Sequence, residues 1–249
     1  MTRHVNTQGG TRSRLPLAMV WELGVGLLVA ALLTETVRLI TAAPVTFHLG
    51  VGSIYLGMAG LLLWWWPTTH SNFGWANRIT LFRGVLIAIF TGLLWVPALL
   101  ARHADLVLGV TLVALLLDGL DGWVARRTAT TTAFGARFDM ELDAFFILML
   151  CVAAILLDKV APWVLAIGAL RYVFVAAGSL WPWLSVGLPV SRRRKVICVW
   201  QVVTLLAILL PSISATAATG LAAVSLLSLA VSFLTDAIWL YRQSHADRV

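Results

Sequence analysis

Residues 115–146 read LLLDGLDGWVARRTATTTAFGARFDMELDAFF, and this stretch decides the fold. Between a leucine run and a pair of phenylalanines it holds four aspartates, at Asp118, Asp121, Asp139 and Asp143. Ionisable side chains are costly in hydrocarbon and are rare there without a function. The apolar flanks and the acids between them therefore predict two consecutive membrane helices, joined by a short polar connection that carries a functional site.

The whole chain has the composition of a membrane protein. Of its 249 residues, 60% are hydrophobic and 12% are charged, whereas soluble domains carry about 25% charged residues. A helix needs about 20 apolar residues to cross the bilayer, and helices satisfy the backbone there. Apolar runs predict eight spans, at residues 17–41, 47–66, 79–101, 104–124, 140–157, 162–184, 196–211 and 217–241. We expect an all-α integral membrane protein.

Basic residues lie mostly on one side of these predicted spans. Lys and Arg are enriched in cytoplasmic loops, so the side that holds Arg126, Arg127 and residues 192–195 is expected to be cytoplasmic. The same rule places both termini there, as tails at residues 1–16 and 243–249. The expected site is therefore cytoplasmic, at the boundary of the membrane.

The charge and the cysteines exclude other classes of function. The net charge of +7 is explained by topology and by anionic lipid heads, and no nucleic-acid motif accompanies it. Cys151 and Cys198 lack the paired spacing of a disulfide framework or a zinc site. We expect lipid contacts and no nucleic-acid partner.

The spacing of the aspartates favours a metal site. Residues three or four apart share one face of a helix, so Asp118 pairs with Asp121 and Asp139 pairs with Asp143. Because the two helices are antiparallel neighbours, the pairs can face each other. Four carboxylates repel unless positive charge lies among them, and Mg²⁺ prefers carboxylates together with substrate phosphates. The alternative is that these aspartates pair with arginines as boundary salt bridges.

Glycines and an arginine among the acids point the same way. Glycine in a helix costs about 1 kcal/mol relative to alanine, so Gly119, Gly122 and Gly135 indicate close approach by a backbone or a ligand. Arg126 offers the bidentate partner that a diphosphate needs. The stretch therefore predicts a metal-assisted phosphate site.

This order of residues resembles the signature of the CDP-alcohol phosphatidyltransferases, D-x2-D-G-x2-A-R-x8-G-x3-D-x3-D. Every named position is filled, at Asp118, Asp121, Gly122, Ala125, Arg126, Gly135, Asp139 and Asp143. Upstream, Asn77, Thr80 and Arg83 resemble the Asn-x-x-Thr-x-x-Arg of the family's first core span. Downstream, Lys195 and Gln201 resemble positions of its basic loop, although Ile197 and Cys198 stand where the family often has Lys and Thr.

The resemblance implies a fold and a reaction. It implies a six-helix core over residues 75–242, preceded by about two extra transmembrane helices in residues 17–74, and a homodimer. Members transfer a phosphoryl-containing group from a CDP-linked donor to an alcohol, with release of CMP, and we expect transfer of a phosphatidyl group in phospholipid biosynthesis. The expected location is the bacterial inner membrane.

The resemblance also implies roles for single residues. Asp118, Asp121 and Asp139 correspond to ligands of Mg²⁺ or Mn²⁺, with two ions expected, and Asp143 corresponds to the general base, which can share a metal. The residues expected at the CDP site are Gly122, Ala125, Arg126 and Gly135, together with Asn77 and Thr80.

The acceptor and some alternatives stay open at this stage. Arg171 and Lys195 are candidate contacts for an acceptor phosphate, which favours glycerol 3-phosphate, although Arg171 can instead pair with an acid such as Asp236. A CDP-amino-alcohol donor acting on diacylglycerol is an alternative. A cation transporter is another, but its site would lie near the midplane among repeats. We also expect Glu35 to pair with Arg38, and His48 to be solvated.

Overall fold

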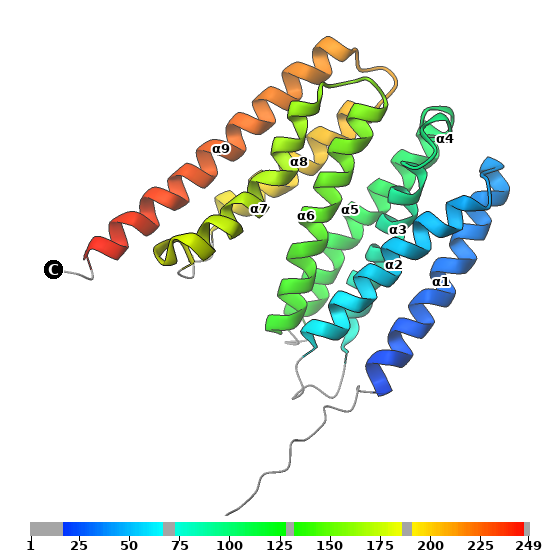
Figure 1. The fold of residues 1–249 in the computed structure, drawn as a ribbon, viewed down its shortest axis with the longest axis horizontal. Helices are drawn as coiled ribbons and strands as arrows, with labels where there is room; N and C mark the ends of the chain where they lie inside the picture. Colours follow the sequence, from blue (N-terminus) through cyan, green and yellow to red (C-terminus); the bar gives the residue numbers. More distant parts are fainter. Residues whose placement is uncertain (1–16, 67–72, 128–131, 186–190, 247–249) are drawn as a thin grey trace, which may run out of the picture.

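The computed structural model describes residues 17–66, 73–127, 132–185 and 191–246, and every regular element in these ranges is helical (Figure 1). The α-helices are α1 (Leu17–Thr41), α2 (Thr46–Trp65), α3 (Trp75–Leu93), α4 (Pro97–Arg102), α5 (Ala104–Arg127), α6 (Ala133–Leu156), α7 (Leu165–Leu180), α8 (Arg192–Leu209) and α9 (Ala215–Ala246). Two short 3₁₀ turns flank α7, η1 (Pro162–Val164) before it and η2 (Pro182–Ser185) after it. The predicted N-terminal tail, residues 1–16, lies outside the described ranges.

Six of these helical segments are long and apolar enough to cross a membrane. They are α1, α2, α3, most of α5, most of α9, and η1 joined to α7. The other two long helices, α6 and α8, fall short because each carries charge at its N-terminal end, Asp139 to Asp143 in α6 and Arg192 to Lys195 in α8. The chain is an all-α membrane protein, as predicted, with eight long helices in its described part.

Proline explains two of the places where the helices differ from the predicted spans. The expected span 79–101 is divided, because α3 ends at Leu93 and α4 begins at Pro97. Proline has no N–H to donate and is tolerated at the first position of a helix. In the same way α7 ends at Leu180, just before Pro182. At the other end of the chain, α9 continues to Ala246, past the predicted boundary of the tail.

The central helix of the bundle is α3. In its most apolar window 72% of the residues are buried, against 22–33% in the other five candidate spans. It packs against α1, α2, α5 and α6. Several polar residues on α3 are therefore buried against other helices, and Arg83 is only 1% exposed, whereas Arg78 is exposed.

The two N-terminal helices pack closely onto this central helix. A Cβ atom on Gly84 would lie 2.6 Å from Met58 Sδ, and one on Gly92 would lie 2.5 Å from a side-chain carbon of α2. Small residues of this kind let membrane helices approach one another. Tyr55 Oη donates a hydrogen bond of 2.6 Å to the Leu23 carbonyl, which ties α2 to α1.

The remaining helices form the opposite flank. In Figure 1, α1 and α2 lie on one side of α3, α5 and α6, while α7 and α9 lie on the other. α7 and α8 pack on α6, and α9 packs on both of them. The carboxylate-bearing helices α5 and α6 thus lie in the middle of the bundle, beside α3.

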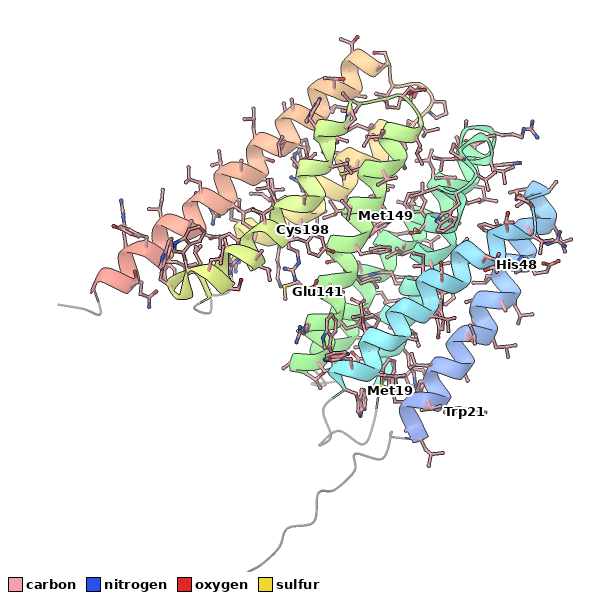
Figure 2. The ribbon with its side chains drawn as sticks, viewed as in Figure 1. Met19, Trp21, His48, Glu141, Met149 and Cys198 are labelled. Atoms are coloured by element: carbon pink, nitrogen blue, oxygen red, sulfur yellow. The ribbon has the colours of Figure 1, made fainter. Side chains whose placement is uncertain are left out.

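An ion pair forms where α1 meets α2. Arg38 donates to Glu35 Oε1 at 2.6 Å, as predicted. His48, which Figure 2 shows near the start of α2, has its Nε2 atom 3.1 Å from Glu35 Oε2. The prediction of a merely solvated His48 is therefore wrong, because the turn between the two helices brings the imidazole onto this carboxylate.

Candidate active site

One arginine lies among all four aspartates. Arg83 Nη1 is 2.5 Å from Asp118 Oδ1 and 3.1 Å from Asp121 Oδ2. Its Nη2 atom is 2.9 Å from Asp139 Oδ1 and 2.7 Å from Asp143 Oδ1. The structure therefore brings the two acidic pairs together, from α5 on one side and α6 on the other, around a guanidinium supplied by α3.

The local sequence explains this convergence. Spacings of three and four residues put each pair on a single helix face, and α5 and α6 both contact α3. The start of α6 is fixed by Thr132, whose side chain accepts a hydrogen bond of 3.0 Å from the Gly135 N–H. Asp139 then follows one turn later, with Asp143 one turn beyond it.

Thr80 holds one of the four carboxylates from α3. Its Oγ1 atom lies 3.0 Å from Asp121 Oδ2 and 3.1 Å from the Ala76 carbonyl oxygen, so its single proton is shared between a charged and a neutral acceptor. Thr80 is 3% exposed and Asp121 is 4% exposed. The side chains of the other three acids are 27–39% exposed. Asp121 is thus the fixed, buried member of the cluster.

Three of the acids fit a divalent metal ion. Asp118, Asp121 and Asp139 each offer a carboxylate oxygen, and these oxygens lie within 4.8 Å of one another. Asp139 Oδ1 is buried and accepts no hydrogen bond, although it lies close to Arg83. Four carboxylates against one guanidinium leave three negative charges when all are ionised. Oxygen ligands with surplus negative charge suit Mg²⁺ or a similar hard cation.

Asn77 on α3 and Gly135 on α6 lie next to each other in the structure. Asn77 Nδ2 donates to the Phe73 carbonyl at 2.6 Å, and a Cβ atom on Gly135 would lie 2.5 Å from Asn77 Oδ1. The close approach that Gly135 permits is therefore one by a side chain of α3. A Cβ atom on Gly119, in contrast, would meet nothing within 4 Å.

The remaining residues of the expected CDP site are only partly described. Gly122 lies half-buried on α5, one residue after Asp121. The side chains of Ala125 and Arg126 fall outside the described part of the structure. Their contacts with a nucleotide therefore stay predictions.

Arg171 pairs with an acid, as one of the two alternatives held, but that acid is Glu141 and not Asp236. Arg171 Nη2 donates to Glu141 Oε1 at 2.6 Å. Asp236 instead pairs with Arg193 and lies 3.8 Å from Arg194. The physical reason is the packing of α7 on α6, which brings Arg171 beside the face of α6 that carries Glu141.

Lys195 is the last residue of the basic run at residues 192–195. Lys195 is exposed and forms no ion pair with the residues that the structure describes. It lies in the first turn of α8, a helix that packs on α5, α6 and α9. The candidate acceptor residues therefore differ in state, because one is paired and the other is solvated.

α8 also covers one side of the cluster. A small hollow is lined by Arg83, Asp118, Asp143, Phe146 and, from α8, Cys198 together with two valines. Figure 2 shows Cys198 on α8. Both described cysteines, Cys151 and Cys198, are free thiols.

An apolar groove of about 350 Å³ lies between α2, α3, α6 and α7. Met58, Leu61, Ile87 and Phe145 are among its lining residues, and Glu141 is one of its few polar ones. The groove and the carboxylate cluster therefore share helices α3 and α6.

The central position of Arg83 was not expected from the sequence. The N-x-x-T-x-x-R pattern included it, but no role followed from that pattern. A signal was present, since Arg83 interrupts an apolar run in which an unpaired charge would be costly. Its partners are 35–60 residues further along the chain, so only the packing of α3 on α5 and α6 identifies them.

Comparison with known proteins identifies a family. The family model of the CDP-alcohol phosphatidyltransferases matches residues 73–236, more than half of the chain. The match begins just before α3 and ends within α9, so it includes the four aspartates and Arg83 and leaves out α1 and α2. No curated protein and no solved structure matches the chain.

Proposed function

We infer that this chain, which belongs to the CDP-alcohol phosphatidyltransferase family, transfers a phosphatidyl group from CDP-diacylglycerol to a small polar alcohol and releases CMP. The family uses CDP-linked donors and alcohol acceptors in membranes, and it generally depends on a divalent metal. The observation that carries the proposal is the convergence of Asp118, Asp121, Asp139 and Asp143 within a bundle of membrane helices.

We assign the metal site to Asp118, Asp121 and Asp139, whose oxygens are close enough to share an ion. We propose two ions, Mg²⁺ or Mn²⁺, with Asp143 as an added ligand. Divalent ions held by these residues would supply positive charge for the diphosphate of the donor and for the attacking and leaving oxygens. Thr80 orients Asp121 by its hydrogen bond.

Asp143 is the proposed general base. The acceptor oxygen bonds to the lipid-side phosphorus of the donor while the bond from that phosphorus to the CMP oxygen breaks, and Asp143 takes the hydroxyl proton. A base must come within hydrogen-bond reach of that proton. Asp143 Oδ1 faces Arg83, and the residue lines the hollow beside α8, so a site for the hydroxyl next to this carboxylate is consistent with the packing.

We propose that the protein contacts the donor at both of its ends, the CDP moiety and the acyl chains. Arg126 and the small residues Gly122, Ala125 and Gly135, with Asn77, take the CDP moiety. The acyl chains stay in hydrocarbon, where the groove between α2, α3 and α6 offers an apolar surface beside the helices that carry the acids. A lipid donor suits a site at the boundary of membrane helices, because its CDP moiety is polar and its acyl chains are apolar.

The acceptor is proposed to be glycerol 3-phosphate. Lys195 is exposed and available for its phosphate, whereas Arg171 must first exchange its bond to Glu141 for one to the phosphate. We also propose a homodimer in a bacterial inner membrane, with the site and both termini on the cytoplasmic side, where the basic residues gather.

The test is CMP release by the purified protein in detergent. CDP-diacylglycerol, Mg²⁺ or Mn²⁺ and a panel of alcohols are supplied, with Asp143→Asn measured in parallel. Release that needs one alcohol and disappears in the variant is the expected result. Release only from CDP-amino-alcohols with diacylglycerol would replace the donor, and no release from either donor would contradict the proposed function.

A further inference from the structure

We propose that Arg83 is the internal counter-ion of the carboxylate cluster and competes with the divalent cation for the same oxygens. The inference rests on the proposed function, because it assumes that the aspartates bind a metal ion. It adds a role for a residue that is neither a metal ligand nor a base. In that role Arg83 sets how tightly the metal is held.

The Arg83 side chain contacts all four aspartates of the cluster. Each of its two terminal nitrogens lies between two aspartates, at 2.5–3.1 Å, and the side chain is 1% exposed. Its Nε atom, in contrast, has no hydrogen-bond partner among the described residues. The guanidinium is therefore held by the carboxylates at its fork, and the buried stem contributes no polar contact of its own.

This arrangement solves a problem of the metal-free protein. Carboxylates that converge in a protein interior repel one another, and their desolvation is costly unless a positive charge pairs with them. Arg83 supplies that charge from α3, the helix against which α5 and α6 both pack. The four aspartates can therefore stay converged before any metal binds.

The same contacts oppose the metal once it arrives. An ion bonded to Asp118 Oδ1 at the usual ~2.1 Å lies within about 5 Å of the Arg83 Nη1 atom that contacts that oxygen. At such a distance from a guanidinium that is only 1% exposed, two positive charges repel each other. Arg83 therefore weakens metal binding and makes it reversible, as an exchange of one cation for another at shared ligands.

A purely structural role predicts the opposite effect. If Arg83 only shaped the cluster, its removal would disorder the ligands, and the metal would bind less tightly or equally. If Arg83 competes, a neutral side chain at this position tightens the binding. The direction of the change in metal affinity therefore distinguishes the two roles.

The experiment titrates Mn²⁺ into the purified full-length protein in detergent and counts free Mn²⁺ by electron paramagnetic resonance. Arg83→Gln is expected to lower the Kd for Mn²⁺ at least tenfold, and Arg83→Lys, which keeps the charge, to leave it within about threefold. Arg78→Gln is the matched control, since Arg78 is on the same helix but pairs with Glu22 away from the cluster. An Arg83→Gln protein that binds Mn²⁺ as weakly as wild type, or more weakly, overturns the proposal.

A second pair of variants covers the case in which Arg83→Gln does not fold. Asp143→Asn lowers the negative charge and removes the proposed added ligand, but it leaves Asp118, Asp121 and Asp139 intact, and the effect of Arg83→Gln is compared within this background. The same tenfold tightening is expected when Arg83→Gln is added to Asp143→Asn, and its absence again overturns the proposal. Failure of the proposed function looks different, because the wild-type protein would then release no CMP from either donor, whatever its affinity for Mn²⁺.

Discussion

Replacing Thr80 by valine removes one hydroxyl from the site and keeps its volume. Thr80 Oγ1 lies 3.0 Å from Asp121 Oδ2, and both residues are at most 4% exposed, so water cannot take over this hydrogen bond. A hydrogen bond to a charged group is worth about 1.5–3 kcal/mol, which corresponds to roughly 10- to 150-fold in an equilibrium constant at ~1.4 kcal/mol per tenfold. Residues that orient metal ligands typically affect affinity by about 10–100-fold. We expect Thr80→Val to weaken Mn²⁺ binding by a factor in this range.

The assay is the same Mn²⁺ titration, with CMP release measured in parallel. Thr91→Val is the matched control, because Thr91 is also buried on α3 but donates only to the Ile87 carbonyl, at 2.8 Å. Thr80→Ser keeps the hydroxyl and should retain most of the affinity. If Thr80→Val titrates like wild type, Asp121 does not depend on this hydrogen bond and the assignment of Thr80 is wrong.

Three further predictions address other parts of the site. Asp143→Asn should reduce CMP release by about 10²–10⁴-fold while Mn²⁺ still binds; an unchanged rate would exclude Asp143 as the base. Gly135→Ala should destabilise the protein by about 1–3 kcal/mol in chemical unfolding, because its Cβ atom would lie 2.5 Å from Asn77 Oδ1; the loss should shrink when Asn77→Ala is also present, and equal losses in both backgrounds would contradict this contact. Lys195→Gln should raise the KM for glycerol 3-phosphate several-fold without changing the KM for the donor, and an unchanged KM would remove Lys195 from the acceptor site.

Much of the helical architecture could be predicted from hydrophobicity alone. Long apolar runs must form helices in a bilayer, and the spans follow from their lengths. The boundaries were less exact where proline intervenes, as at Pro97, because an apolar run shows where lipid is tolerated and does not show where the backbone turns. The N-terminal parts of α6 and α8 are similar cases, since both helices begin before the predicted apolar segment.

The parts of the site that lie within one helix, or on two helices consecutive in the chain, could be predicted from the sequence. The pairing of Asp118 with Asp121, and of Asp139 with Asp143, follows from helical periodicity. Periodicity within one helix says nothing about contacts with a distant one, so the place of Arg83 and the hydrogen bond from Thr80 needed the packing of α3. For the same reason the sequence left open whether Arg171 pairs with an acid and did not identify Glu141 as that acid.

The fit of α2 into α3 has a consequence for how this enzyme can be divided. A chain shortened to begin at residue 73 would keep the whole family match and all four aspartates. It would also expose to lipid the hollows at Gly84 and Gly92, which are shaped for side chains of α2. The segment that the family model matches, residues 73–236, is therefore smaller than the unit that packs as one bundle. A truncated or chimeric version of the protein should keep α1 and α2.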